Sequence, residues 1–157
     1  MLIKKRDGQT VIELMLILPV FMMIVFVILE LGNMAYHTIM AHHISYELAR
    51  VGSMVGVRTH SGSVDSSRIN SKMKEALQRT VGNRRAGEMQ FAARLEQTGT
   101  DPQVREHVNQ DIVVTLVYRI NLAYPLTSFI FADYPKRLGI KRIRAVVRMP
   151  VERPLIN

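Results

Sequence analysis

The chain has 157 residues, and an apolar run near its N-terminus leaves roughly 100 of them for one small globular domain. Its formal net charge of +8 would suit a nucleic-acid partner, but three basic residues precede the apolar run and the others lie among acidic residues, so we expect none. The absence of cysteine excludes a disulfide framework and a thiolate metal site.

The N-terminal apolar segment predicts a single membrane span. Residues 14–29 carry no charge, and residues 9–35 reach spanning length only by including Glu13 and Glu30. A carboxylate in a membrane helix costs a few kcal/mol, so each glutamate needs a reason. Basic residues precede the span, and none follows it before Arg50. The positive-inside rule therefore predicts a cytoplasmic N-terminus and a translocated remainder.

A conventional secretory signal is the first alternative to a retained span. Such a signal is cleaved after its apolar run, at a site with small residues. The sequence after Leu29 offers no convincing site of that kind, and the helical pattern continues through it. We therefore favour a retained helix.

The helical pattern predicts one helix from about Gln9 to Gly56, with residues 36–56 as an amphipathic continuation of the stalk. Inside the apolar half, Pro19 removes one backbone hydrogen bond and predicts a kink. Apolar residues in the second half recur at spacings of three or four, which predicts a buried stripe. Its members are Tyr36, Ile39, Met40, Ile44, Leu48, Val51 and Val55.

The histidines and glycines of this helix do not predict a metal site or a helix-association site. His37, His42 and His43 lack the spacing that places two ligands on one helix face, so we expect no metal and no cofactor. Gly52 and Gly56 have the spacing of a helix-association motif, but so near the helix end we expect them to loosen it.

Residues 57–157 predict an α+β head domain. Small polar residues at 59–67 indicate a linker, and an apolar helical face over 69–81 predicts a second, shorter helix. Gly82 is placed to cap this helix, and residues 83–87 are expected to form a loop.

Three further segments predict a small antiparallel sheet packed on the long helix. Residues 89–95 form a weak strand, whereas residues 111–121 are β-branched with alternating apolar side chains. Residues 141–149 alternate between an apolar and a basic face. The connection at 122–140 contains two prolines and has room for a short helix.

The basic face of the last strand carries Arg142, Arg144 and Arg148. It could engage an anionic polymer or surface by charge. We favour the simpler interpretation of a solvated edge strand, where charge prevents aggregation. We do not expect an enzyme, because the sequence lacks nucleophile-elbow, phosphate-loop and zinc-protease motifs.

The N-terminus resembles the prepilin peptidase site of type IV pilins: basic residues, Gly8, and Glu13 five positions later at the head of an apolar helix. The resemblance implies a leader over residues 1–8 and cleavage between Gly8 and Gln9. Glu13 would then neutralise the new α-amino group of a neighbouring subunit, because pairing makes buried charges tolerable. The alternative is a glutamate that merely lies at the membrane interface.

A longer stretch is similar to the TadE-like family of tight-adherence systems. The matching positions are Gly8, Glu13, Leu18, Pro19, Glu30 and Gly32, followed by an alanine-arginine-x-glycine element at 49–52. The resemblance implies a pilin-like α+β fold and a minor pilin-like structural subunit of a tight-adherence type IV pilus or its assembly machine. It implies residence in the bacterial inner membrane with a periplasmic head, or incorporation into an extracellular pilus.

The implied partners are the membrane, prepilin peptidase, other pilin or minor pilin subunits, and inner-membrane platform proteins. Glu30 and Gly32 would form a motif at the outer membrane boundary, where Glu30 either pairs with a neighbouring stalk or stays solvated. The alternative function is a single-pass, membrane-anchored periplasmic binding module that uses its basic face. Glu13 distinguishes the two, because assembly requires it and a simple anchor does not.

Overall fold

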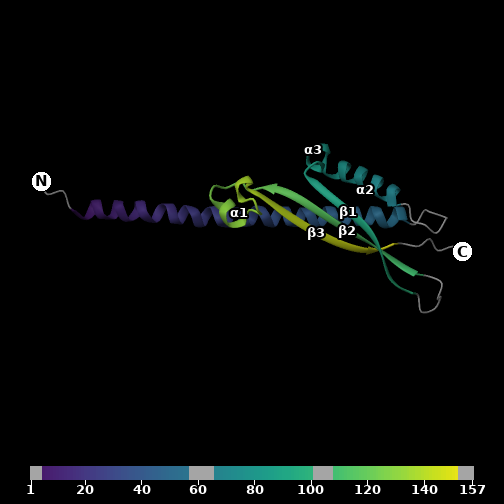
Figure 1. The fold of residues 1–157 in the computed structure, drawn as a ribbon. Helices are drawn as coiled ribbons and strands as arrows, with labels where there is room; N and C mark the ends of the chain where they lie inside the picture. The colour runs from purple at the N-terminus through teal and green to yellow at the C-terminus, as the bar shows by residue number, and fades with distance from the viewer. Residues whose placement is uncertain (1–4, 57–65, 101–107, 152–157) are drawn as a thin grey trace. The chain divides into compact units, whose positions relative to one another are not determined.

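The computed structural model describes residues 5–56, 66–100 and 108–151. These residues divide into two compact units, Met1–Tyr36 with Asn121–Lys141 and His37–Ile120 with Arg142–Asn157. The elements, shown in Figure 1, are α1 (Lys5–Gly56), α2 (Ser66–Val81), α3 (Asn83–Ala86), β1 (Met89–Thr100), β2 (Val108–Asn121), α4 (Thr127–Phe131), the 3₁₀ helix η1 (Lys136–Leu138) and β3 (Ile140–Pro150).

The three strands form an antiparallel sheet in the order β1-β2-β3. Between β1 and β2, Met89 pairs with Tyr118 and Leu95 with Ile112, with a shift of register near Gln97. The β2–β3 pairing is bounded by hydrogen bonds from Leu122 N–H to Gly139 O, 2.8 Å, and from Val151 N–H to Gln110 O, 2.9 Å. The predicted α+β arrangement of a long apolar helix, a small antiparallel sheet and a second helix is confirmed.

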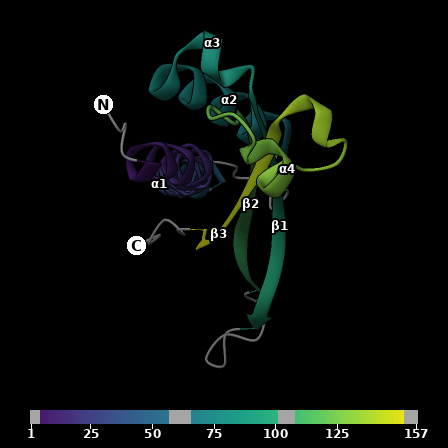
Figure 2. The same ribbon diagram turned by 90° about the vertical axis from the view of Figure 1, so that its left-hand side faces the viewer.

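The core of the second unit lies between the sheet, α2 and the C-terminal half of α1. The alternation predicted for β2 is confirmed, because its apolar side chains at every second position are buried. Figure 2 shows α2 and the sheet from the end of the molecule. The buried side chains include Val114, Leu116, Tyr118 and Ile120 on β2, Ile143 and Ala145 on β3, and Ile69, Met73 and Leu77 on α2.

The buried face of α1 differs from the predicted stripe. Ile44 and Leu48 are buried as expected, but Ile39 is 71% exposed and Tyr36 is also exposed. The stripe that contacts the core is made mostly of small residues, which allow a helix and a sheet to approach closely. Its members are Ala41, Ile44, Ser45, Leu48, Ala49, Gly52 and Ser53.

Gly52 has a packing role that the sequence analysis did not assign. A Cβ built on Gly52 would overlap the Cδ1 methyl of Ile112 and lie 3.3 Å from Met73 Sδ. The expectation that Gly52 loosens the helix end is therefore wrong, because this glycine lets α1 approach both α2 and β2, and α1 remains helical to Gly56.

The second helix ends as predicted. Gly82 has a φ of +80° and donates its N–H to Gln78 O, 3.0 Å, as a glycine cap does. The loop expected at 83–87 is instead the one-turn helix α3, in which Ala86 N–H bonds Gly82 O. Arginine and alanine are good helix formers, so the short turn is compatible with its sequence. Most of the predicted linker at 59–67 lies outside the described residues, and its last two residues belong to α2, which begins at Ser66.

The connection between β2 and β3 contains α4 and η1, so the predicted short helix is present. This connection and the apolar half of α1 belong to the same compact unit.

Candidate functional site

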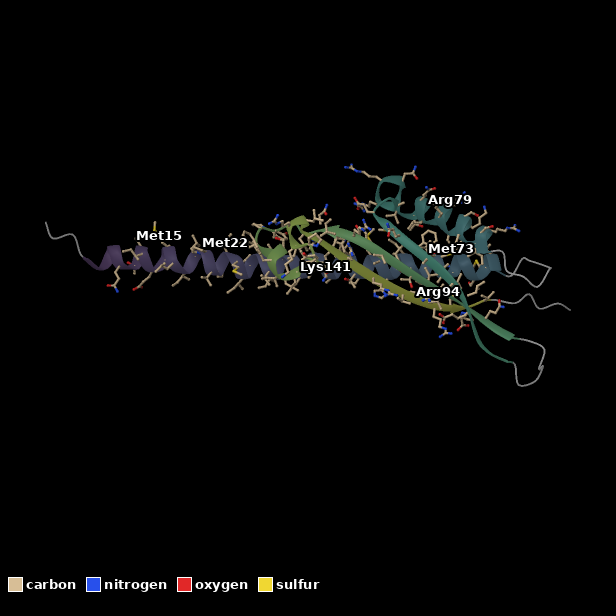
Figure 3. The ribbon with its side chains drawn as sticks, viewed as in Figure 1. Met15, Met22, Met73, Arg79, Arg94 and Lys141 are labelled. Atoms are coloured by element: carbon tan, nitrogen blue, oxygen red, sulfur yellow. The ribbon has the colours of Figure 1, made fainter. Side chains whose placement is uncertain are left out.

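The apolar half of α1 is exposed. Every residue from 8 to 24 is exposed, and no residue of its most apolar 18-residue window is buried. Met15 and Met22 are labelled on this part of the helix in Figure 3. Among the described residues, α1 is the one helix long and apolar enough to cross a membrane. A continuous apolar surface of this length needs lipid or protein around it.

The predicted cleavage position lies within α1. The helix begins at Lys5, so the peptide bond between Gly8 and Gln9 is helical. A Cβ on Gly8 would meet nothing within 4 Å, and the same holds for Gly32. Packing among the described residues therefore explains neither glycine, in contrast to Gly52.

Glu13 is exposed one turn beyond Gln9. The Gln9 side-chain amide donates a hydrogen bond to Glu13 Oε1, 3.1 Å. Residues four apart lie on one helix face, so a terminal amino group at Gln9 would lie one helical turn from the Glu13 carboxylate. Further along, α1 continues through Pro19 without ending, and the predicted kink there stays a prediction.

Glu30 is fully buried, although it follows the apolar run directly. Its Oε2 accepts hydrogen bonds from the backbone N–H groups of Ala123 and Tyr124, each 3.0 Å. Its Oε1 accepts one from the Asn33 amide, 3.1 Å. The Thr127 hydroxyl lies 3.1 Å from Oε2 and 2.7 Å from Tyr124 O, and its single proton serves one of them at a time.

The expectation of a solvated carboxylate is therefore wrong, because Glu30 is buried and accepts hydrogen bonds from its own chain. Pairing of Glu30 with a neighbouring stalk stays a prediction. Hydrogen bonds from backbone N–H groups compensate for the loss of water around the charge. The two backbone donors lie 93 and 94 residues further along the chain, a separation that no local motif reveals.

A contact between two aromatic rings also joins α1 to the segment that binds Glu30. Phe26 and Tyr124 stack with centroids 6.0 Å apart and an interplanar angle of 18°. Nearby, Leu126 has a φ of +68°, a left-handed conformation that costs a non-glycine residue about 1–2 kcal/mol. The hydrogen bonds from residues on both sides of Leu126 to Glu30 hold it in that conformation.

The three arginines of β3 all lie on its exposed face, as the alternation predicts. One of them, Arg148, takes part in two ion pairs. Arg148 Nε lies 2.7 Å from Asp111 Oδ2, and Arg148 Nη2 lies 3.5 Å from Glu96 Oε2. The charge of Arg148 is therefore paired within the sheet.

His37 packs edge-on against Tyr118, with ring centroids 5.4 Å apart. Within the part of the chain that the structure describes, no group of three or more histidine, aspartate or glutamate side chains could hold a metal ion.

The comparison with protein families agrees with the N-terminal pattern. Residues 8–50 match the family model described as TadE-like protein. No curated protein and no solved structure matches the chain. The matched segment begins at Gly8 and includes Glu13, Pro19, Glu30 and Gly32. The similarity to the TadE-like family thus covers residues 8–50, which lie within α1.

Proposed function

We propose that the chain is a minor pilin-like, TadE-type structural subunit of a tight-adherence type IV pilus or of its assembly machine. The observation that carries the proposal is the TadE-like match over the segment that forms the exposed apolar helix. Prepilin peptidase would cleave after Gly8. The role is structural and not catalytic, and it requires no cofactor.

The exposed helix suits a subunit that passes from a membrane into an assembly. Lipid tails and apolar side chains are similarly hydrophobic, so exchanging one for the other depends mainly on packing. Flexible methionines such as Met15 and Met22 adapt to different neighbours. Gly8 and Gly32, which no packing within the described residues explains, are available to a protease and to a neighbouring helix.

The proposed location is the bacterial inner membrane. Basic residues at positions 4–6 precede the apolar run, which favours a cytoplasmic N-terminus and a periplasmic head. In this orientation the Gly8–Gln9 bond is at the cytoplasmic face, and assembly into an extracellular pilus follows extraction from the membrane.

Glu13 provides the test that separates a subunit from a simple anchor. After cleavage the amino group at Gln9 needs a carboxylate partner in an apolar filament. We expect Glu13→Gln to be inserted and processed normally but to lose association with pilin or platform proteins, measured by cross-linking in membranes. Glu47→Gln, on the same helix, is the matched control and should retain association. Normal association of Glu13→Gln and of Glu13→Leu would contradict the proposal.

That contradictory result would favour the second candidate, a membrane-anchored binding module. Its support is the exposed pair Arg142 and Arg144 on β3. The pairing of Arg148 with Asp111 and Glu96 reduces the free positive charge of this face, so we rank the module second.

A further inference from the structure

We propose that the connection between β2 and β3 is an interface foot: a segment that lies on the phospholipid headgroups beside the point where α1 leaves the bilayer. The interface foot comprises residues 122–139, including α4 and η1. The proposal requires that α1 spans a membrane, but it does not depend on assembly into a pilus.

The position of the interface foot along α1 follows from its contacts. Glu30, the residue after the uncharged run, binds the backbone at Ala123 and Tyr124. Phe26, one turn earlier and inside the run, stacks on Tyr124. The contacts thus place the interface foot where hydrocarbon gives way to headgroups, if residues 14–29 occupy the hydrocarbon.

The interface foot exposes large apolar side chains to an unusual extent. Thr127 and Ala132 are buried, but Phe129 is 71% exposed and Tyr134 is 91% exposed. Scattered apolar residues are ordinary on protein surfaces, whereas a cluster in one short segment points to a partner. The exposed members are Leu126, Phe129, Ile130, Tyr134 and Leu138. An aromatic ring with a polar tip, as in Tyr134, suits the membrane interface.

The charges of the interface foot fit phospholipid headgroups. Lys136 and Arg137 are exposed among the apolar side chains. Lys136 Nζ donates to Phe129 O, 2.7 Å, which holds one cation close to an exposed ring. The acidic residue Asp133 is paired with Lys141 Nζ at 2.8 Å. Apolar side chains mixed with cations are the composition of segments that lie in the plane of a bilayer with anionic lipids.

The absence of tryptophan from the chain makes the proposal directly testable. Single-tryptophan variants of the full chain would be reconstituted into phosphatidylcholine–phosphatidylglycerol vesicles with quenchers placed either near the headgroup or deep in the acyl chain. Phe129→Trp reports on the interface foot. Phe21→Trp, in the apolar run, is the control for insertion, and Tyr46→Trp, beyond the run on the same helix, is the control for exposure to water.

We expect Phe129→Trp to show blue-shifted emission and to be quenched more by the headgroup-proximal quencher than by the deep one. Phe21→Trp should show the opposite preference, and Tyr46→Trp little quenching by either. Adding Arg137→Glu should reduce quenching of Phe129→Trp in anionic vesicles but much less in purely zwitterionic ones.

Three results would overturn the proposal. Phe129→Trp could behave like Tyr46→Trp while Phe21→Trp is quenched, which would place the interface foot in water. The emission of Phe129→Trp could be blue-shifted only at high protein-to-lipid ratios. The exposed side chains of the interface foot would then contact a second copy of this chain instead of lipid. Unquenched Phe21→Trp would show that α1 itself is outside the bilayer.

Discussion

The attachment of residues 123–127 to Glu30 gives a quantitative prediction. Glu30→Gln keeps one carbonyl oxygen for Ala123 N–H and Tyr124 N–H but removes the charge. Hydrogen bonds to a charged group contribute about 1.5–3 kcal/mol each and neutral ones about 0.5–1.5, so two bonds lose about 2 kcal/mol together. Glu30→Ala leaves both donors unpaired, and we expect a loss of about 2–4 kcal/mol because two backbone N–H groups lose their acceptor.

Hydrogen exchange of the Ala123 and Tyr124 amides measures this loss directly. An amide exchanges faster when the local opening that exposes it costs less free energy, by tenfold for each 1.4 kcal/mol. In detergent micelles we therefore expect roughly 30-fold faster exchange in Glu30→Gln and up to roughly 700-fold in Glu30→Ala. Asn33→Ala is the matched control, because it removes only the bond to Oε1 and should change exchange by less than about fivefold. Unchanged exchange in Glu30→Ala would refute the attachment.

Three further changes test the packing, the ion pair and the backbone. Gly52→Ala should destabilise the chain in thermal unfolding by about 1–3 kcal/mol from overpacking, less a gain of about 1 kcal/mol in helix propensity. Ile112→Val should cost less in that variant than in the wild type, and additive effects would argue against the contact. Arg148→Ala should lose about 0.5–1 kcal/mol, and equal losses in Arg148→Ala and Arg144→Ala would exclude a contribution from the ion pairs. Leu126→Gly should slow exchange at Tyr124 by relieving about 0.5–1 kcal/mol of net strain, and faster exchange would contradict this.

Short-range sequence patterns were sufficient to predict much of the fold. Alternation in β2 predicts which side chains are buried, because the side-chain period of a strand permits only two faces. Gly82 predicts the end of α2, because a left-handed cap favours glycine. The N-terminal pattern around Gly8 and Glu13 predicted the similarity to the TadE-like family over residues 8–50.

Contacts between distant segments were not predictable in the same way. The period of α1 is visible in the sequence, but the orientation of its buried face is set by how closely the sheet approaches. Small residues such as Gly52 therefore occupy that face, while Ile39 faces outward. The partners of Glu30 come from a connection without a recognisable motif, so burial of this carboxylate could not be inferred from residues near it.

The mature N-terminus is the most direct test of the proposed function. The chain would be expressed with and without prepilin peptidase, and its start determined by intact-mass and N-terminal peptide mass spectrometry. We expect a start at Gln9 that depends on the peptidase and is lost in Gly8→Ala, while Gly32→Ala is processed normally. Because a Cβ at Gly8 meets nothing within 4 Å, misfolding would not explain the loss. An intact Met1 in the presence of peptidase, or a start beyond Leu29, would contradict the account.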